Sequence, residues 1–259
     1  MPELPDLQVF SHNLNKRLHG KTLETVELFP GKKTLVTIDS LKKNLEGQIL
    51  KKIVREGKEL HFYFGNKQVL GLHLMLKGQL HIFEGDNQVK NKIIELVFDD
   101  KTGLVMSDFM KIAVPTLNPE PASAPDALSE EVNAGFLKKQ LQDNKENIKS
   151  FLLDQKKIRG IGNAYADEIL WDARLSPFSI CGKIPDAKIK QLAKSIKSVL
   201  TDAEEQIIKS NPDLITGEVR DFLQVHTSRK THTDTGQLIH SKDLKSRKTY
   251  YTNEQELFK

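Results

Sequence analysis

The stretch that decides the fold runs from Leu153 to Leu170 and reads LDQKKIRGIGNAYADEIL. Gly160 and Gly162, one residue apart, allow the backbone to approach another surface closely. Asn163 follows as the predicted cap of a helix whose free N–H groups and dipole favour an anion. Basic side chains precede the turn at Lys156, Lys157 and Arg159. The arrangement predicts a clamp for a phosphate backbone, while a purely structural helix–turn shares the same glycine pattern.

Helical patterns surround this turn. The sequence predicts helices over residues 134–142, 145–153, 163–173 and 186–209, and Ser129 as a helix N-cap before two glutamates. Another helix is expected over residues 5–18. Residues 115–127 hold four prolines and are predicted to be a linker.

The remaining parts read as strands. Apolar and polar residues alternate at 23–29, 60–64 and 93–98, with Gly, Asn and Asp between such segments, which is typical of a β-sandwich or barrel. Short strands are also expected over the C-terminal residues. We therefore predict an α+β protein with these parts: an N-terminal β-sandwich domain with an opening helix (1–114), a linker (115–127), a helical domain (128–224) and a C-terminal β-hairpin (225–259).

Composition limits the classes of function. The chain has 259 residues, 38% of them hydrophobic, and no apolar run near the ~20 residues of a membrane span. No signal-peptide pattern is present, so a cytoplasmic protein is expected. The single cysteine, Cys181, excludes an intrachain disulfide and a zinc site with several cysteines. A net charge of +4 is compatible with nucleic-acid binding but does not require it.

The chain begins Met1-Pro2-Glu3. Removal of the methionine would leave Pro2 with a free secondary amine beside a carboxylate. An α-amino group titrates near pH ~8, against ~10.4 for lysine, so much of it is nucleophilic at neutral pH. Its attack on an aldehyde carbon gives a cationic imine, an electron sink for covalent catalysis. A processed terminus without any role is the plainer alternative.

Pro2-Glu3-Leu4-Pro5, followed some 150 residues later by the glycine-marked stretch, resembles the Fpg/Nei family, that is formamidopyrimidine-DNA glycosylase and endonuclease VIII. The stretch is similar to the helix–two-turn–helix element of that family. The resemblance runs the length of the chain and includes the order of its parts. It implies a base-excision-repair enzyme that acts on damaged double-stranded DNA as a glycosylase and abasic-site lyase.

The resemblance also implies roles for individual residues. Pro2 matches the nucleophile, Glu3 the carboxylate that assists base loss, and Lys58 a lysine that contacts the phosphate beside the lesion. Asp6 stands where a glutamate is usual, and we group it with the DNA contacts. Three further phosphate contacts are expected at positions that match the family, namely Lys156, Asn163 and Arg247.

The C-terminal part departs from the family, whose zinc finger usually has four cysteines. Their expected positions fall near four other residues: Thr231, Thr235, Thr252 and Gln255. Three histidines have spacings that match no standard zinc site: His226, His232 and His240. We therefore expect a zincless finger held by packing, with no metal and no cofactor.

Two departures bear on the substrate. Met75 and Leu76 match the residue that fills the gap left by a flipped base, with Leu76 the closer match, and Lys111 belongs to a second gap-filling segment. That segment, DFMKIA at 108–113, replaces DPRRFG of Fpg, and residues 209–221 are too few for the loop that covers 8-oxoguanine. Both changes favour oxidised pyrimidines, hydantoins or abasic sites, and the alternative within the class is an 8-oxoguanine and formamidopyrimidine glycosylase.

Two rival classes remain open. A damage-binding protein without catalysis would account for the lost arginines and cysteines, but it has no need of a free proline amine. An RNA- or ribosome-associated protein could use the same helical element, but it leaves Pro2-Glu3 unexplained. We expect a monomer that binds damaged double-stranded DNA, has no membrane partner and is nucleoid-associated if the source is bacterial.

Overall fold

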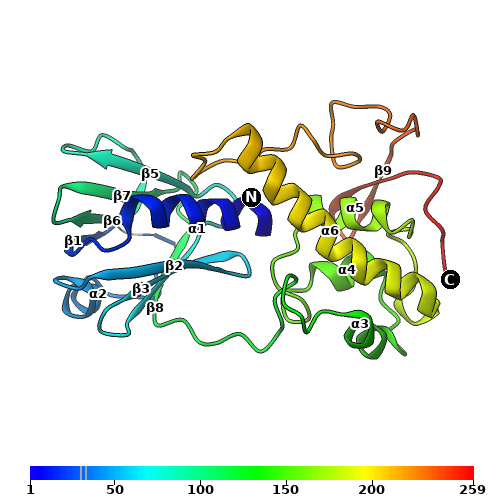
Figure 1. Ribbon diagram of the computed structural model, residues 1–259, viewed down its shortest axis with the longest axis horizontal. Coiled ribbons are helices and arrows are strands. Elements are labelled where there is room, and N and C mark those ends of the chain that lie inside the picture. Colours follow the sequence, from blue (N-terminus) through cyan, green and yellow to red (C-terminus); the bar gives the residue numbers. More distant parts are fainter. Residues whose placement is uncertain (30, 33) are drawn as a thin grey trace. The chain divides into compact units, whose positions relative to one another are not determined.

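The structure is a computed structural model that describes residues 1–29, 31–32 and 34–259. The chain forms two compact units (Figure 1). The first unit contains Met1–Pro121 and Ile207–Glu218, and the second contains Ala122–Gln206 and Val219–Lys259. The first unit is built mainly from strands and the second mainly from helices, so the predicted α+β fold is confirmed.

Two four-stranded antiparallel sheets make up most of the first unit. One has the order β1 (Leu23–Leu28), β6 (Lys92–Phe98), β7 (Thr102–Ser107) and β5 (Gln79–Glu84). The other has the order β2 (Leu50–Glu56), β3 (Glu59–Phe64), β4 (Val69–His73) and β8 (Val114–Leu117). The alternating residues of β3 bury Leu60, Phe62 and Phe64 on one face. These side chains join one hydrophobic core with residues of both sheets.

Two helices belong to this unit, α1 (Leu4–Leu18) and α2 (Ile38–Leu45). The helix α1, blue in Figure 1, packs against β2. Polar side chains fix this contact, because the Ser11 hydroxyl donates to the Ile53 carbonyl at 2.9 Å and the Asn15 amide oxygen accepts the Ile53 N–H at 2.8 Å. The N-terminus is therefore held to a strand of the core.

The second unit contains the helices α3 (Ala134–Leu141), α4 (Ile148–Leu153) and α5 (Asn163–Asp172), a 3-10 turn (Cys181–Lys183) and most of α6 (Asp186–Ser210). A hairpin of β9 (His240–Leu244) and β10 (Arg247–Tyr251) completes it. The helix α6 buries residues spaced three or four apart, which is the pattern of an amphipathic helix: Ile189, Leu192, Ile196 and Leu200.

Three expectations need correction or refinement. Ser129 does not cap a helix; Asn133 caps α3 instead, with its side-chain oxygen accepting the Phe136 N–H at 3.0 Å. Residues 114–117, which include the start of the predicted linker, form β8 at a sheet edge, where a proline such as Pro115 is tolerated because its missing N–H is not needed. Residues 207–218 belong to the first compact unit, although the predicted helical domain runs through them.

Among the described residues, no helix combines the length and the apolar character that crossing a membrane requires.

Candidate functional site

The amino terminus of the first unit is fixed by a reciprocal helix cap. Glu3 is the N-cap of α1 and its carboxylate accepts the backbone N–H of Asp6, while the Asp6 carboxylate accepts the Glu3 N–H at 2.8 Å. Glu3 is 5% exposed and Asp6 is fully buried. This capping box holds Glu3 directly after the buried Pro2. Because a buried capping carboxylate is poorly placed to meet a phosphate, the geometry argues against the predicted DNA contact by Asp6.

A segment from the far end of the sequence lies beside this terminus. The amino group of Met1 forms an ion pair with Glu218, which belongs to the same unit. The Leu214 carbonyl accepts the side-chain N–H of Asn13 at 2.9 Å and so anchors the segment to α1. The short stretch after α6 therefore contributes a carboxylate near the start of the chain, which its sequence did not reveal.

Lys58 lies in the two-residue turn between β2 and β3, directly after Gly57, whose φ is +59°. The Arg55 guanidinium donates to the Gly57 carbonyl at 3.1 Å and to the Gln8 side chain at 2.9 Å, which ties the turn to α1. The positive φ explains the glycine, because other residues rarely adopt it.

His73, at the end of β4, was not among the predicted site residues. Burial lowers the pKa of its imidazole, the charge of Lys58 lowers it further, and Glu59 acts in the opposite direction. The ring nitrogen Nδ1 accepts the Met75 N–H at 3.0 Å. His73 therefore lies within electrostatic range of Lys58 and also shapes the turn that follows. A lone histidine in a strand gave no signal of this in the sequence.

The turn after β4 presents two of the predicted gap-filling residues. Met75 has a positive φ of 54°, and Leu76 is 51% exposed. The turn is tight at Gly78, whose N–H donates to the Leu74 carbonyl at 2.8 Å and where a Cβ would lie 2.3 Å from that carbonyl oxygen. Only glycine fits there, so the turn holds Leu76 out in solvent.

A second turn, after β7, is organised by the carboxylate of Asp108. This side chain is 1% exposed and accepts three backbone N–H groups, from Met110, Ile112 and Ala113, at 2.8 to 2.9 Å. Lys111 lies in the turn with a φ of +55°. Ile112 stands where the family's DPRRFG segment has its phenylalanine, so the aromatic wedge is missing at that position. The turn nevertheless carries an exposed aromatic side chain one residue after Asp108, since Phe109 is 67% exposed.

In the second unit, the loop between α4 and α5 is closed by Gln155. Its amide donates to the Leu153 and Ile161 carbonyls at 3.0 and 2.9 Å and accepts the Gly160 N–H at 2.9 Å. Lys156 follows, exposed on the surface. The predicted cap is wrong by one residue: Gly162 is the N-cap of α5, and Asn163 is its first helical residue.

The side chain of Asn163 is directed to the C-terminal hairpin. Its amide donates to the Lys248 carbonyl at 3.0 Å, next to Arg247. Arg247 pairs with Leu244 across a two-residue turn whose members both have positive φ, a geometry that suits the twist of a hairpin. The structure thus brings Asn163 and Arg247, which are 84 positions apart, into one region.

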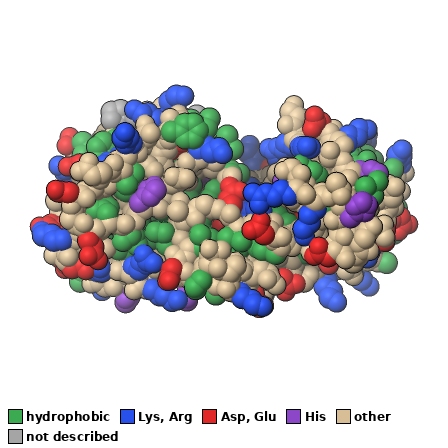
Figure 2. Space-filling model, turned by 90° about the horizontal axis from the view of Figure 1, so that it is seen from above, with side chains coloured by type: hydrophobic (Ala, Val, Ile, Leu, Met, Phe, Trp, Pro, Cys, Tyr) green, Lys and Arg blue, Asp and Glu red, His purple; other side chains and the backbone are tan. Residues whose placement is uncertain are grey.

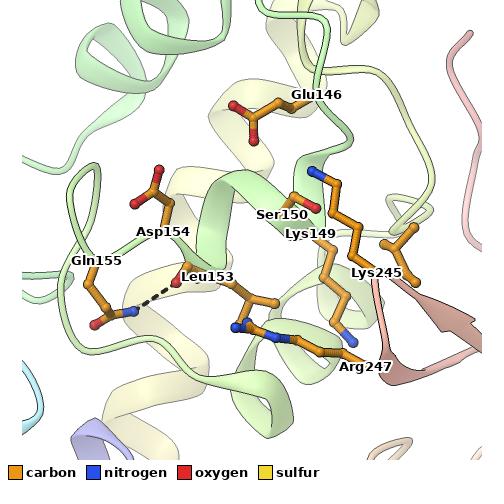
Figure 3. A pocket seen from close by; sticks show the side chains of 9 residues that line it. Glu146, Lys149, Ser150, Leu153, Asp154, Gln155, Lys245 and Arg247 are labelled. Carbon is orange, nitrogen blue, oxygen red and sulfur yellow. Dashed lines mark hydrogen bonds between the residues drawn. The ribbon is translucent and has the colours of Figure 1, made fainter.

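A pocket of about 360 Å³ lies beside this region, between α4 and the hairpin. Arg247 and Lys245 reach it from the hairpin, and the acidic residues Glu146 and Asp154 also line it (Figure 3). Its walls therefore carry both signs of charge. On the face shown in Figure 2, lysine and arginine side chains are likewise interspersed with acidic ones over each unit. The mixed charge of this face therefore does not by itself identify the residues that contact DNA.

The C-terminal residues form turns that are closed by hydrogen bonds. The Gln255 side chain accepts the Thr252 N–H at 2.8 Å and donates to the Leu175 carbonyl at 3.0 Å. The hydroxyls of Thr233 and Thr235 are 2.9 Å apart. Within residues 1–29, 31–32 and 34–259, no group of three or more His, Cys, Asp or Glu side chains could hold a metal ion.

Comparisons with known proteins agree with this architecture. Residues 1–113 match the formamidopyrimidine-DNA glycosylase N-terminal domain, and residues 123–212 match the formamidopyrimidine-DNA glycosylase H2TH domain. The formamidopyrimidine-DNA glycosylase of Lactiplantibacillus plantarum is 31% identical over 206 residues, which are 76% of this chain and 75% of that protein.

Two solved structures extend the comparison to the whole chain. MutM in complex with DNA containing carbocyclic 8-oxo-G has a TM-score of 0.86 and 26% identity, covering 97% of this chain and 98% of that one. Lactococcus lactis Fpg in complex with DNA containing an oxidised pyrimidine has a TM-score of 0.86 and 25% identity, with the same coverage. Both domain models and these relatives show that the chain belongs to the Fpg/Nei family of DNA glycosylases.

Proposed function

We propose that this protein is a base-excision-repair glycosylase that removes an oxidised base from duplex DNA and then cleaves the strand at the abasic site. The observation that carries the proposal is the buried Pro2-Glu3 pair at the capped start of α1, inside the domain that matches the glycosylase N-terminal model. A protein that only bound DNA would have no use for an amine and a carboxylate fixed together.

The chemistry begins once Met1 is removed and the Pro2 nitrogen is free. The nitrogen attacks the sugar C1′ while the bond to the base breaks, and the base leaves with a proton that Glu3 can supply. The proton of the Pro2 nitrogen then passes to O4′ as the C1′–O4′ bond breaks, which opens the sugar ring and leaves a cationic imine between Pro2 and C1′. This imine acidifies the C2′ proton. Loss of that proton breaks the bond to the 3′ phosphate, and a second elimination then breaks the bond to the 5′ phosphate. Water releases the sugar fragment from Pro2.

The basic residues hold the DNA backbone around this sugar. Lys58 in the first unit, and Lys156, Asn163 and Arg247 in the second, serve as phosphate contacts. The planar guanidinium of Arg247 suits bidentate binding of phosphate oxygens. Fixing the phosphates positions C1′ for attack, which is a large part of the rate that an enzyme can supply.

Apolar side chains replace the base that has been turned out of the stack. The exposed Leu76 and the half-buried Met75 stand in one turn and the exposed Phe109 in another, each turn fixed by its own hydrogen bonds. Lys111 is the polar candidate of the second turn. Such wedges stabilise a kinked duplex with one nucleotide flipped out.

We infer a preference for oxidised pyrimidines, hydantoins and abasic sites. Two features support this preference: Met110 and Lys111 stand where the family segment has arginines, and the segment after α6 is short. An 8-oxoguanine enzyme is the alternative. A panel of duplexes containing thymine glycol, a hydantoin, an abasic site or 8-oxoguanine opposite cytosine decides between them. Equal excision of 8-oxoguanine and thymine glycol would contradict the preference.

Zinc does not fit the C-terminal hairpin of this chain. The side chains near the cysteine positions of the family are hydroxyls and an amide, and the Gln255 amide already accepts the Thr252 backbone N–H and donates to the Leu175 carbonyl. Zinc takes Cys, His, Asp or Glu ligands. No step of the proposed reaction uses a metal.

Borohydride trapping tests the lyase proposal directly. The untagged protein is incubated with a duplex containing one abasic site, and a fusion with an uncleaved N-terminal tag is the matched control. A covalent adduct that forms only with the untagged protein supports the role of Pro2. An adduct of equal yield from the tagged protein would remove Pro2 from the mechanism. Tight abasic-site binding without any adduct would favour the non-catalytic damage binder, and preference for structured RNA would favour the RNA-associated class.

A further inference from the structure

A buried ion pair lies beneath the C-terminal hairpin. The Lys149 amino group is 2.7 Å from the Asp167 carboxylate, and both side chains are almost fully buried, with exposures of 1% and 0%. Lys149 comes from α4 and Asp167 from α5. Removing two charges from water is costly and often brings no net stability. The other contacts of the pair indicate instead that it positions a neighbouring strand.

Those contacts converge on β10. Lys149 donates to the Thr249 hydroxyl at 2.8 Å and to the Lys248 carbonyl at 3.4 Å. Asp167 accepts the Tyr250 N–H at 3.1 Å. Three consecutive residues of the strand are thus bound by one ion pair, directly after Arg247. The Asn163 amide donates to the same Lys248 carbonyl, so the pair shares an acceptor with a proposed phosphate contact.

The start of the C-terminal part, residues 224–226, is attached to Asp167 and to the residue that follows it in α5, Glu168. The His226 ring nitrogen Nδ1 lies 2.7 Å from the Asp167 carboxylate. Glu168 accepts the N–H groups of three successive residues at 2.7 to 2.9 Å: Gln224, Val225 and His226. A two-stranded hairpin alone is marginal in water. Side-chain hydrogen bonds and one buried ion pair supply the attachment here, in a hairpin whose residues do not suit zinc.

We propose that Lys149 and Asp167 are positioning residues for DNA binding, which hold β10 so that Arg247 and Asn163 meet the phosphate backbone together. The inference rests on the proposed function. Neither residue touches the DNA. Asp167 acts through the backbone N–H of Tyr250, and Lys149 acts through the Lys248 carbonyl and the Thr249 hydroxyl. Breaking the pair should therefore remove the contribution of Arg247 even though Arg247 itself is unchanged.

The test compares salt dependence of binding to a duplex with a tetrahydrofuran abasic-site analogue. The double variant K149M/D167N removes both charges, which avoids leaving one uncompensated ion in the interior. Each lost phosphate contact makes the slope of log affinity against log salt shallower by about 0.9. We expect this change in R247A and in K149M/D167N, and no further change when R247A is added to the double variant. The control K138M/D186N, which removes the exposed pair 2.6 Å apart at Lys138 and Asp186, should keep the wild-type slope.

A wild-type slope in K149M/D167N, still lowered by R247A, would overturn the inference. If circular dichroism shows that the double variant does not fold, T249V takes its place. It removes the hydroxyl that Lys149 contacts and that also donates to the Arg247 carbonyl at 3.2 Å. The effect of R247A should then be smaller in T249V than in the wild type, and an undiminished effect would count against the positioning role. Failure of the wild-type protein itself to bind the abasic duplex would instead refute the proposed function.

Discussion

Glu3 has a structural role and a proposed catalytic role, and a single substitution can separate them. Its carboxylate caps α1 by accepting the Asp6 N–H, and in the proposed mechanism it also supplies a proton. Glu3→Gln keeps an oxygen that can accept the N–H but loses the titratable group. We expect the free energy of unfolding to change by less than about 0.5 kcal/mol and base release to fall by about 10²- to 10⁴-fold. Urea titration and a single-turnover glycosylase assay measure the two effects. A large loss of stability with normal excision would reverse this assignment.

His73 gives a prediction about pH. Burial, reinforced by Lys58, lowers its pKa from the ordinary value of 6.5, so the folded protein keeps the ring neutral where the unfolded chain takes up a proton. Stability should therefore fall as the pH drops below about 6.5 and until the folded pKa is reached. His73→Asn retains an acceptor for the Met75 N–H but cannot titrate. Urea unfolding at pH 7.5 and 5.5 should show a larger loss in the wild type than in the variant, and equal losses would exclude His73 as the source.

Among the elements, the turn built on Asp108 carries the clearest test of a wedge. Phe109 is 67% exposed, so Phe109→Ala should leave stability within about 0.5 kcal/mol. If Phe109 stacks on a base, binding to an abasic duplex should weaken by about 1 to 3 kcal/mol. Leu35→Ala is a matched control, because Leu35 is also an exposed apolar residue of the first unit, at 73%. Fluorescence anisotropy measures both. An equal effect of the two variants would show that Phe109 has no specific role.

Local sequence patterns predicted which helices and strands form more accurately than they predicted the residues at which these begin. Alternation in β3 and the apolar spacing of α6 were visible because a buried face imposes a period on the sequence. The ends depended on single hydrogen bonds: Asn133 rather than Ser129 caps α3, and Gly162 rather than Asn163 caps α5. Several polar residues can fit a cap, and only the geometry of the chain chooses among them.

The candidate site could be predicted only where a motif marked it. Pro2-Glu3 and the glycine-marked loop were readable, and the structure brings Asn163 to the hairpin that carries Arg247. His73, Phe109 and the buried Lys149–Asp167 pair had no such mark. The role of each depends on contacts with residues distant in the sequence or on its exposure to solvent. Neither can be derived from a single sequence.

At the scale of the whole molecule, each compact unit contains residues that the sequence places far apart. Residues 207–218 lie in the first unit, with Leu214 and Ile215 packed against its core. The sequence does not reveal that the chain returns to the first unit, because the apolar residues of this segment could pack equally well in either unit. The proposed phosphate contacts are divided in the same way, with Lys58 in the first unit and Arg247 in the second.

Because these contacts lie in separate units, we expect the effects of removing them on DNA binding to be additive. Lys58→Ala and Arg247→Ala should each make the salt slope of binding to an abasic duplex shallower by about 0.9. The double variant should lose the sum of both, because the residues belong to separate units. Within the second unit, by contrast, Arg247→Ala and the loss of the Lys149–Asp167 pair should not add. Binding measured from 50 to 200 mM salt distinguishes these patterns. A double variant that departs strongly from the sum of the two single effects would contradict additivity and show that the two units bind DNA cooperatively.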